Sequence, residues 1–306
     1  MASLEHLASG TVHELTANHL VGRVPQNHLQ IDDPLVSGRH AEFVWTGSCW
    51  EVRDLGSKNG TFAGMSQIER ITRVTLCQDM RLAFGNQENL YVVRDDSPPR
   101  AMATCDDGRV VTAEDGILVL PDPEHPAYTV FDEAAGRWLA ESGDGERRAV
   151  ANEDVLVIDD HAWRLELPHI TESTWQHEPD QLLLHTMTLH LAVSRDEEHV
   201  QMTLSTSHRT VKLKTSAHGY LVLTLARARL EDAADPEISS DEAGWLYVSD
   251  LVDQLKTNPN QLNVAIFRAR QQVARAGVMH ATDLFERRPN TRQIRLGLRR
   301  IEIELI

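Results

Sequence analysis

Hydrophobic and polar positions alternate in short stretches from Val12 to about Arg94. The stretches LQID, HAEFVW, CWEVRD, MRLAFG and NLYVVRD have the period of a strand, and Gly, Asn or Asp residues separate them. Turn signals at intervals of about eight to twelve residues are typical of an antiparallel β-sandwich or barrel. The next stretch, DDSPPR at 95–100, has two prolines and no period, so we expect a linker there.

The pattern over residues 101–170 also predicts short strands, and therefore a second, smaller β unit. Two hairpin-like stretches follow in the same order as in the first unit. A tryptophan, Trp50 or Trp138, comes early in the second strand of the first hairpin. This similarity has two explanations: a shortened, degenerate repeat of the first unit, or a chance match between two small β folds.

The period changes in the C-terminal part of the chain. After strand-like stretches up to residue 215, HGYLVLTLARARL predicts a helix, and Ser249 is placed to cap a second helix through DLVDQLK. We expect NPN at 258–260 to break the chain and a third helix to run from about Gln261 to Ala276. FERRPNTRQIRLG then predicts a β-hairpin with Pro289 and Asn290 at its tip.

The third predicted helix has one apolar face, and Gly277 is expected to end it. The apolar positions follow the spacing i, i+4, i+7, i+11, which places them on one side of a helix. We expect this face to be buried; it consists of Leu262, Ile266, Ala269 and Val273.

The 306 residues leave room for two or three domains. The chain has no run of about 18 apolar residues and no basic region followed by an apolar core at its N-terminus. Its cysteines are odd in number and form no C-x-x-C pair, which argues against a disulfide framework or zinc ribbon. We therefore expect a cytoplasmic protein without a membrane span. The cysteines are Cys49, Cys77 and Cys105.

The charge is distributed unevenly along the chain. A net charge of -16 would by itself argue against a nucleic-acid partner. Residues 96–170 hold 17 acidic and 6 basic residues, whereas residues 256–306 hold 10 basic and 4 acidic residues. A basic end on an acidic chain is the pattern expected when one module meets nucleic acid and the others do not.

Three short motifs in the first unit hold the chemistry of a phosphate site. They are VGR at 21–23, SGRH at 37–40 and DLGSKNGTF at 54–62. A phosphate needs cations, hydroxyl groups and N–H donors together, and these motifs supply all three. The third motif does not match the nucleotide-binding P-loop pattern. Nor does Ser-x-x-His indicate catalysis here, because no orienting carboxylate or oxyanion donor can be named.

The ordered set of motifs resembles the signature of the forkhead-associated (FHA) domain, over roughly residues 12–95. The resemblance implies an eleven-stranded β-sandwich, within domain limits of 1–95, whose loops bind a phosphothreonine peptide. It assigns peptide binding to Arg23, Ser37, Arg39, Lys58 and Asn59. Arg23 would supply the guanidinium fork, Ser37 a hydroxyl donor and Asn59 an amide for the peptide backbone. The positions with structural roles in the loops are Gly22, His40, Gly60 and Thr61.

Residues 183–306 resemble the OmpR-like winged helix-turn-helix effector domains of bacterial response regulators. The Gly-Tyr usual in the return strand of the wing is missing, and the loop between the first two helices is longer and more acidic than usual. Steps of 100° from Ile266 place several polar side chains on the outer side of the third helix. Arg and Gln there would read base edges, and the wing arginines would contact phosphates. The expected DNA-binding residues are Gln261, Val264, Arg268, Gln271, Gln272, Arg275, Arg287, Arg288 and Arg292.

Together these patterns predict a multidomain protein with an all-β FHA sandwich, a small β unit over 101–170 and an α+β winged helix. The expected function is phosphothreonine-dependent transcription regulation, with a phosphorylated partner from a Ser/Thr kinase pathway, double-stranded DNA and a homodimer as expected partners. The alternative is a signalling adaptor whose winged helix binds protein. We expect no enzymatic activity, cofactor or metal site, because the histidines do not have convergent ligand spacing.

Overall fold

The computed structural model describes the chain except residues 17, 47–48, 135, 169–181, 198, 216–217 and 289–290. The predicted hairpin tip, Pro289 and Asn290, lies outside the described residues. The chain forms two compact units, one built on Met1–Ala101 and the other on Met102–Arg164 with the C-terminal region. No helix in the described part of the chain is both long and apolar enough to cross a bilayer.

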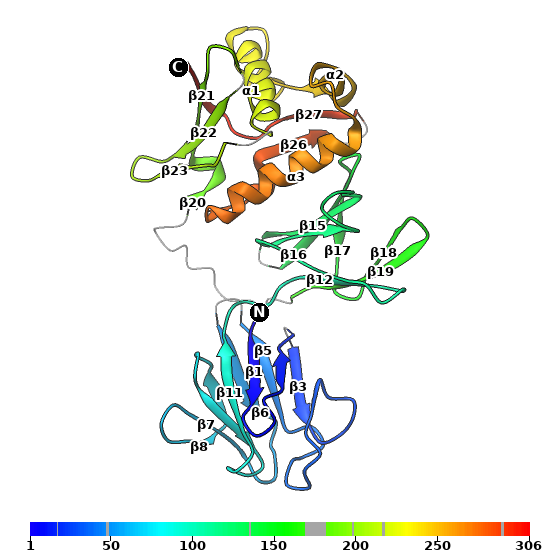
Figure 1. Cartoon of the computed structure of the whole chain (residues 1–306), viewed down its shortest axis with the longest axis vertical. Helices are drawn as coiled ribbons and strands as arrows, with labels where there is room; N and C mark the ends of the chain where they lie inside the picture. The colour runs from blue at the N-terminus through cyan, green and yellow to red at the C-terminus, as the bar shows by residue number, and fades with distance from the viewer. Residues whose placement is uncertain are drawn as a thin grey trace. The chain divides into compact units, whose positions relative to one another are not determined.

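The N-terminal unit consists of two antiparallel-rich sheets with the orders β2-β1-β11-β10-β7-β8 and β4-β3-β5-β6-β9 (Figure 1). The five stretches singled out in the sequence contain strands β4, β5, β6, β10 and β11. The strands are β1 (Ser3–His6), β2 (Val12–Glu14), β3 (Asn18–Gly22), β4 (Leu29–Gln30), β5 (Ala41–Trp45), β6 (Trp50–Asp54), β7 (Thr61–Gly64), β8 (Glu69–Ile71), β9 (Arg73–Thr75), β10 (Arg81–Phe84) and β11 (Leu90–Asp95).

Apolar side chains from both sheets form the core of this unit, as an all-β sandwich requires. Strand β1 pairs with β11, where Leu4 lies opposite Val93 and both are fully buried. The alternation that begins at Val12 missed β1, because four residues are too short to show a period. The other large buried side chains include Phe43, Trp50, Leu82 and Phe84.

Residues 102–166, named here the acidic module, form two four-stranded sheets with the orders β13-β12-β19-β18 and β14-β15-β16-β17. Leu118 and Val130 are among the buried apolar side chains of these sheets, whereas Val110, Val155 and Val157 are exposed. The strands are β12 (Met102–Cys105), β13 (Val110–Thr112), β14 (Ile117–Leu120), β15 (Tyr128–Ala134), β16 (Arg137–Ser142), β17 (Arg147–Val150), β18 (Val155–Ile158) and β19 (His161–Glu166).

The C-terminal region contains a sheet of order β23-β22-β21-β28, three α-helices, and a sheet of order β24-β27-β26. Strands, three helices and a hairpin follow one another as predicted. The elements are β20 (Leu182–Leu183), η1 (Leu184–Thr186), β21 (Thr188–Val193), β22 (Val200–Ser205), β23 (Thr210–Lys212), α1 (Gly219–Ala234), β24 (Leu246–Tyr247), α2 (Val248–Gln254), α3 (Pro259–Arg275), β25 (Val278–Met279), η2 (Ala281–Leu284), β26 (Phe285–Arg288), β27 (Gln293–Leu296) and β28 (Arg300–Leu305).

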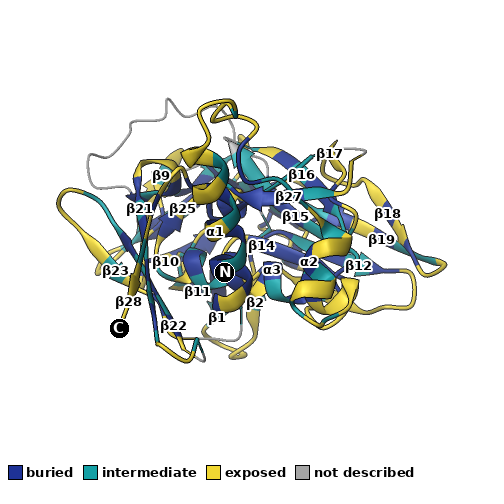
Figure 2. Ribbon diagram, turned by 90° about the horizontal axis from the view of Figure 1, so that it is seen from above, coloured by how far each residue is buried: buried dark blue, intermediate teal, exposed yellow. Residues whose placement is uncertain are grey.

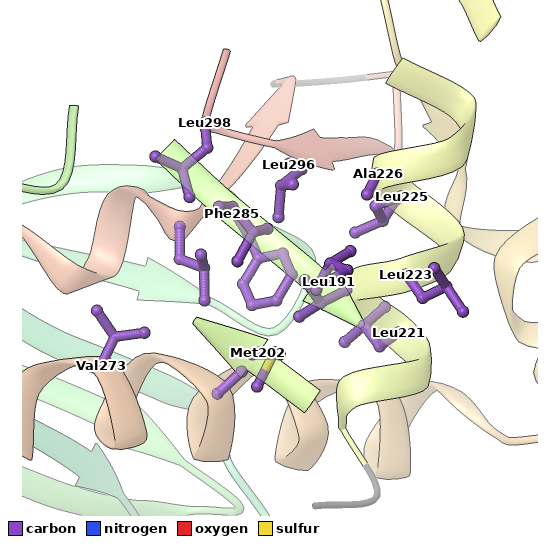
Figure 3. Packing of buried hydrophobic residues seen from close by; sticks show 14 of the residues in the cluster. Leu191, Met202, Leu221, Leu223, Leu225, Ala226, Val273, Phe285, Leu296 and Leu298 are labelled. Atoms are coloured by element: carbon purple, nitrogen blue, oxygen red, sulfur yellow. The ribbon is translucent and has the colours of Figure 1, made fainter. Parts of the chain in front are cut away.

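One hydrophobic core joins these C-terminal elements (Figure 3). Leu221 and Leu225 of α1, Phe285 of β26 and Leu296 of β27 point into it (Figure 3). The predicted apolar face of α3 is buried in the same core, since Leu262, Ile266, Ala269 and Val273 are at most 3% exposed. By contrast, α2 buries only Leu251, and most of its surface is exposed or half-buried (Figure 2).

Two details of the helix starts differ from the sequence prediction. Ser249 does not cap α2, because the helix begins at Val248 and Tyr247 occupies the N-cap position. The Ser249 hydroxyl donates instead to Asp250 at 3.2 Å. The NPN tripeptide forms the start of α3, whereas we had expected it to precede the helix as a separate turn. The Asn258 side chain accepts from the Gln261 amide at 2.9 Å, and Pro259 occupies the first helical turn, where its missing N–H costs nothing.

Candidate phosphate-binding loops and the covered face of α3

Three loops at one end of the N-terminal unit are joined by hydrogen bonds around Ser37. The amide of Arg23 donates to the Ser37 carbonyl at 3.0 Å. The Ser37 hydroxyl accepts from the Lys58 amide at 3.1 Å, and the Asn59 side-chain amide donates to the Leu35 carbonyl at 2.7 Å. The structure thus brings the loops of VGR, SGRH and DLGSKNGTF together.

The cations of these loops are exposed. Arg23, Arg39 and Lys58 all lie at the surface, and the described residues provide none of them with an ion pair. Arg23 Nε donates to the Val36 carbonyl at 3.3 Å, which turns the guanidinium group toward the SGRH loop. Three cations next to a serine hydroxyl are therefore available to an anion from solvent.

His40 links two of the loops from inside the fold. It is fully buried; its Nδ1 accepts from the Ser37 amide at 3.0 Å, and its Nε2 lies 3.1 Å from the Gly60 carbonyl. This pattern places the proton on Nε2, so the ring is neutral. Burial lowers the pKa of His40, against the smaller opposing effects of the Gly60 hydrogen bond and the Asp54 charge. The ring is thus fixed beneath the loops and holds their backbones in place.

Asp54 organises the third loop, a role that the sequence analysis missed. One carboxylate oxygen accepts from the amides of Gly56 and Ser57 at 2.9 and 2.8 Å, and the other from the hydroxyls of Ser57 and Thr61 at 2.6 and 2.7 Å. Burial alone would raise the pKa of Asp54, but these hydrogen bonds lower it. An aspartate two residues before a Gly-Ser pair is the signal that would have indicated this arrangement.

Two glycines allow the loops to approach closely. A Cβ on Gly22 would lie 2.3 Å from the Gly38 carbonyl oxygen, so no larger residue fits between the first two loops. Gly60 has φ of +94°, and a Cβ there would meet the guanidinium group of Arg70 at 2.5 Å. Thr61, which follows it, is fully buried and begins β7.

Comparison with known proteins assigns this unit. A family model described as the FHA domain matches residues 19–85. Residues 19–85 form an FHA domain. The motif residues Gly22, Arg23, Ser37, His40, Asn59 and Gly60 all lie within the matched range.

The similarity to curated proteins is confined to short segments. The FHA domain-containing protein FhaB of Mycobacterium tuberculosis is 36% identical over 63 residues, which are 21% of this chain and 41% of that protein. The oxoglutarate dehydrogenase inhibitor of Corynebacterium jeikeium is 51% identical over 41 residues, or 13% of this chain and 28% of that protein. The chain therefore spans less than half the length of these relatives.

Among solved structures, Mycobacterium tuberculosis EmbR in complex with a low affinity phosphopeptide is 30% identical. The match covers 32% of this chain and 25% of EmbR, with a TM-score of 0.29. The FHA domain of FhaA, solved with the intracellular domain of Rv3910, is 25% identical, covering 31% of this chain and all of that one, with a TM-score of 0.28.

Three of the nine residues expected to bind DNA, all on α3, bind carboxylates of the acidic module. Arg268 pairs with Glu124 at 2.8 Å. Arg275 pairs with Asp115 at 2.7 Å and with Glu114 at 3.0 Å. The Gln271 amide also donates to Glu114, at 2.9 Å. The outer side of α3 thus faces the carboxylates of residues 114–124.

The remaining expected DNA contacts lie in different surroundings. Val264 is buried, and Gln272 is held by the Lys214 carbonyl and the ring of His218, both at 2.6 Å. Arg288 lies over the Trp245 ring and pairs with Glu242 at 2.9 Å. Gln261 and Arg292 are exposed. Arg287 of β26 donates to the Gly143 carbonyl of the acidic module; its side chain is 6% exposed, and this burial lowers its pKa to about 10 despite the opposing Glu141 charge.

Cys105, Asp107 and His161 of the acidic module place one donor atom each within 4.8 Å of one another. The scattered histidines had indicated no such group. However, Arg109 donates to Asp107 at 2.7 Å and lies 3.7 Å from the Cys105 sulfur. The Asp107 carboxylate is therefore already paired with Arg109, and we assign no metal to this group.

Proposed function

We propose that this chain is a phosphothreonine-dependent transcription regulator. Its FHA loops would bind a phosphorylated threonine on a partner protein, and its C-terminal region would bind double-stranded DNA as an OmpR-like winged helix. The main support for phosphothreonine binding is that the loops of Arg23, Ser37 and Lys58 lie together. The two cations are exposed and make no ion pair among the described residues.

The chemistry of the loops suits a phosphate monoester. Such a group carries nearly two negative charges and three acceptor oxygens, so it gains most from cations and hydroxyl donors on one surface. Arg23 supplies a planar fork for two oxygens, and the Ser37 hydroxyl donates to a third. Asn59, held to Leu35 at 2.7 Å, stands where it can contact the peptide backbone beside the phosphothreonine.

The proposed DNA-binding half rests on the order of elements and on charge. Helices α2 and α3 are followed by the β26–β27 hairpin, and the basic residues concentrate in this part of the chain. The partner would be phosphorylated by a Ser/Thr kinase in the cytoplasm, and a homodimer would read paired half-sites.

A signalling adaptor is the second candidate, and one observation favours it. Arg268 and Arg275, the side chains best suited to read guanine, are paired with carboxylates of the same chain. In an adaptor the α3 face would serve protein contacts alone.

One experiment separates these functions. Random-sequence duplexes are selected with the purified full chain, in the presence and absence of a phosphothreonine peptide, and the threonine peptide is the control. The regulator retains a subset of duplexes and binds only the phosphorylated peptide. The adaptor binds the peptide and retains no duplex at any salt concentration.

A further inference from the structure

Both sides of α3 are covered within the second compact unit. One side packs into the C-terminal core through Leu262 and Ile266. On the other side Phe267, 4% exposed, packs against Ile117 and Val119 of β14 in a separate apolar cluster. On the proposed function α3 would enter the major groove, but in this structure the module covers the side of α3 that holds Phe267. Figure 1 shows α3 between the β26–β27 hairpin and strands β15 and β16.

A buried ion pair lies at the centre of the contact. Arg270 donates to both carboxylate oxygens of Glu141, at 2.9 and 3.2 Å, and also to the Phe285 carbonyl at 3.0 Å. Glu141 accepts in addition from Arg147 at 2.8 Å. Because the pair is bidentate and enclosed, it fixes the orientation of the acidic module against α3.

The hairpin that follows α3 is engaged as well. Arg287 of β26 donates to the Gly143 carbonyl at 2.5 Å, and to Asn263 of α3 at 2.6 Å. Gly145 has a positive φ, and a Cβ there would lie 2.3 Å from Arg287 Cδ. The β16–β17 turn is therefore shaped to lie directly on this arginine.

The edge of the contact is made of exposed charges. Arg268–Glu124 and Arg275–Asp115 are ion pairs in which the arginine side chains remain about half exposed to solvent. A groove of about 1000 Å³ lies beside this edge, and Glu124 of the module, His218 and Gln261 are among its lining residues. Exposed pairs next to an unfilled groove contribute little stability each, so this edge is the part that opens most readily.

We propose that the acidic module is a built-in competitor of DNA for the α3 face. Its carboxylates occupy the arginines that a duplex would need for its bases and phosphates. Since module and helix belong to one chain, the module acts at a high effective concentration, and DNA must displace it. This inference rests on the proposed DNA binding and adds its regulation: the closed form is inactive, and opening at residues 114–124 exposes the reading face.

The test uses the full chain and a fluorescent duplex of mixed sequence at low salt. The triple variant Glu114→Gln, Asp115→Asn, Glu124→Gln removes the edge pairs and leaves Arg270–Glu141 intact. Asparagine tolerates the positive φ of residue 115. We expect the variant to bind duplex roughly tenfold more tightly, because the three exposed ion pairs that hold the module on α3 are lost together.

Lost negative charge alone could raise DNA affinity, so a matched control is needed. The triple variant Glu153→Gln, Asp159→Asn, Asp160→Asn makes the same charge change at exposed positions of the module without a described contact to α3. We expect its affinity to stay within about twofold of the original chain. Adding Arg268→Ala and Arg275→Ala to the first triple variant should abolish the gain. Circular dichroism checks that each variant is folded.

The outcomes separate the two ideas. A gain specific to the edge variant supports the competition. Equal affinity of the original chain and both triple variants, or equal gains in both variants, overturns the competition while DNA binding stands. If neither the original chain nor any variant binds duplex at low salt, the proposed DNA binding fails, and the competition fails with it.

Discussion

Arg270 and Glu141 lie 129 residues apart in sequence and form a two-pronged ion pair in which the side chains are only 1% and 3% exposed. Burial alone would raise the pKa of Glu141, but the guanidinium groups of Arg270, Arg147 and Arg287 lower it to about 2. The carboxylate is therefore charged inside the fold, and it unites the acidic module with the C-terminal region.

Glu141→Gln should destabilise the second compact unit by about 3 kcal/mol, because it leaves buried arginines without a counter-charge. Chemical denaturation of the full chain measures the change. The control is Asp241→Asn, which removes the carboxylate from an exposed pair with Arg299 and should cost under about 1 kcal/mol. Equal effects of the two variants would contradict the account of a buried, coupled cluster.

The same carboxylate predicts a pH dependence. Its pKa falls from 4.5 to about 2 on folding, so the unfolded chain binds the proton more readily. The stabilisation is complete above pH 4.5 and is lost as the pH falls toward 2. Over that window the original chain should lose stability relative to Glu141→Gln by about 1.4 kcal/mol per pH unit. Parallel stability curves for the two proteins would refute this.

Arg23→Ala should weaken binding of a phosphothreonine peptide by about 10- to 100-fold, because charge-assisted hydrogen bonds contribute about 1.5–3 kcal/mol. Isothermal titration calorimetry with the phosphorylated and unphosphorylated peptide measures the loss. Arg81→Ala removes an exposed arginine from β10 of the same unit and should leave the affinity unchanged. A preference for phosphothreonine that survives Arg23→Ala would exclude the proposed site.

His40→Ala should destabilise the N-terminal unit by about 2–3 kcal/mol, since the Ser37 amide and the Gly60 carbonyl both lose a buried partner. Peptide affinity should fall as well, because the two loops are no longer held together. Thermal unfolding and the peptide titration test the two effects. Loss of affinity at undiminished stability would instead indicate direct contact between His40 and the ligand.

Asn258→Ala and Ser249→Ala form a matched pair at two helix starts. The first removes an observed cap and should cost about 1 kcal/mol, whereas the second removes a hydroxyl that caps nothing and should be nearly neutral. Denaturation of both variants checks the order, and a larger loss at Ser249 would reverse our assignment.

Local patterns were sufficient for much of this fold. The alternation around Phe43 and Leu82 predicted buried strands, and the spacing of Leu262 and Ile266 predicted the inner face of α3. The three motifs that meet at Ser37 were also recognised from sequence, because each stands where a strand of the sandwich ends or begins.

The contact between α3 and the acidic module could not be predicted in this way. A helical wheel assumes that only one face is covered, so it placed Val264 on an open outer surface, although this side chain is buried. Arg270 and Glu141 carry no shared period or motif, and only the folded chain brings them together. The charge imbalance of residues 96–170 was visible in the sequence, but its partner within the chain was not.

The four hydrogen bonds that Asp54 accepts have a kinetic consequence. They shape the DLGSKNGTF loop during folding, so the loop does not need to be ordered by its ligand. On the proposed function, a phosphopeptide would lose only its own conformational freedom on docking. Its association rate would then be governed by diffusion and charge steering, and the lifetime of the complex by how well each peptide fits a receptor that does not adapt.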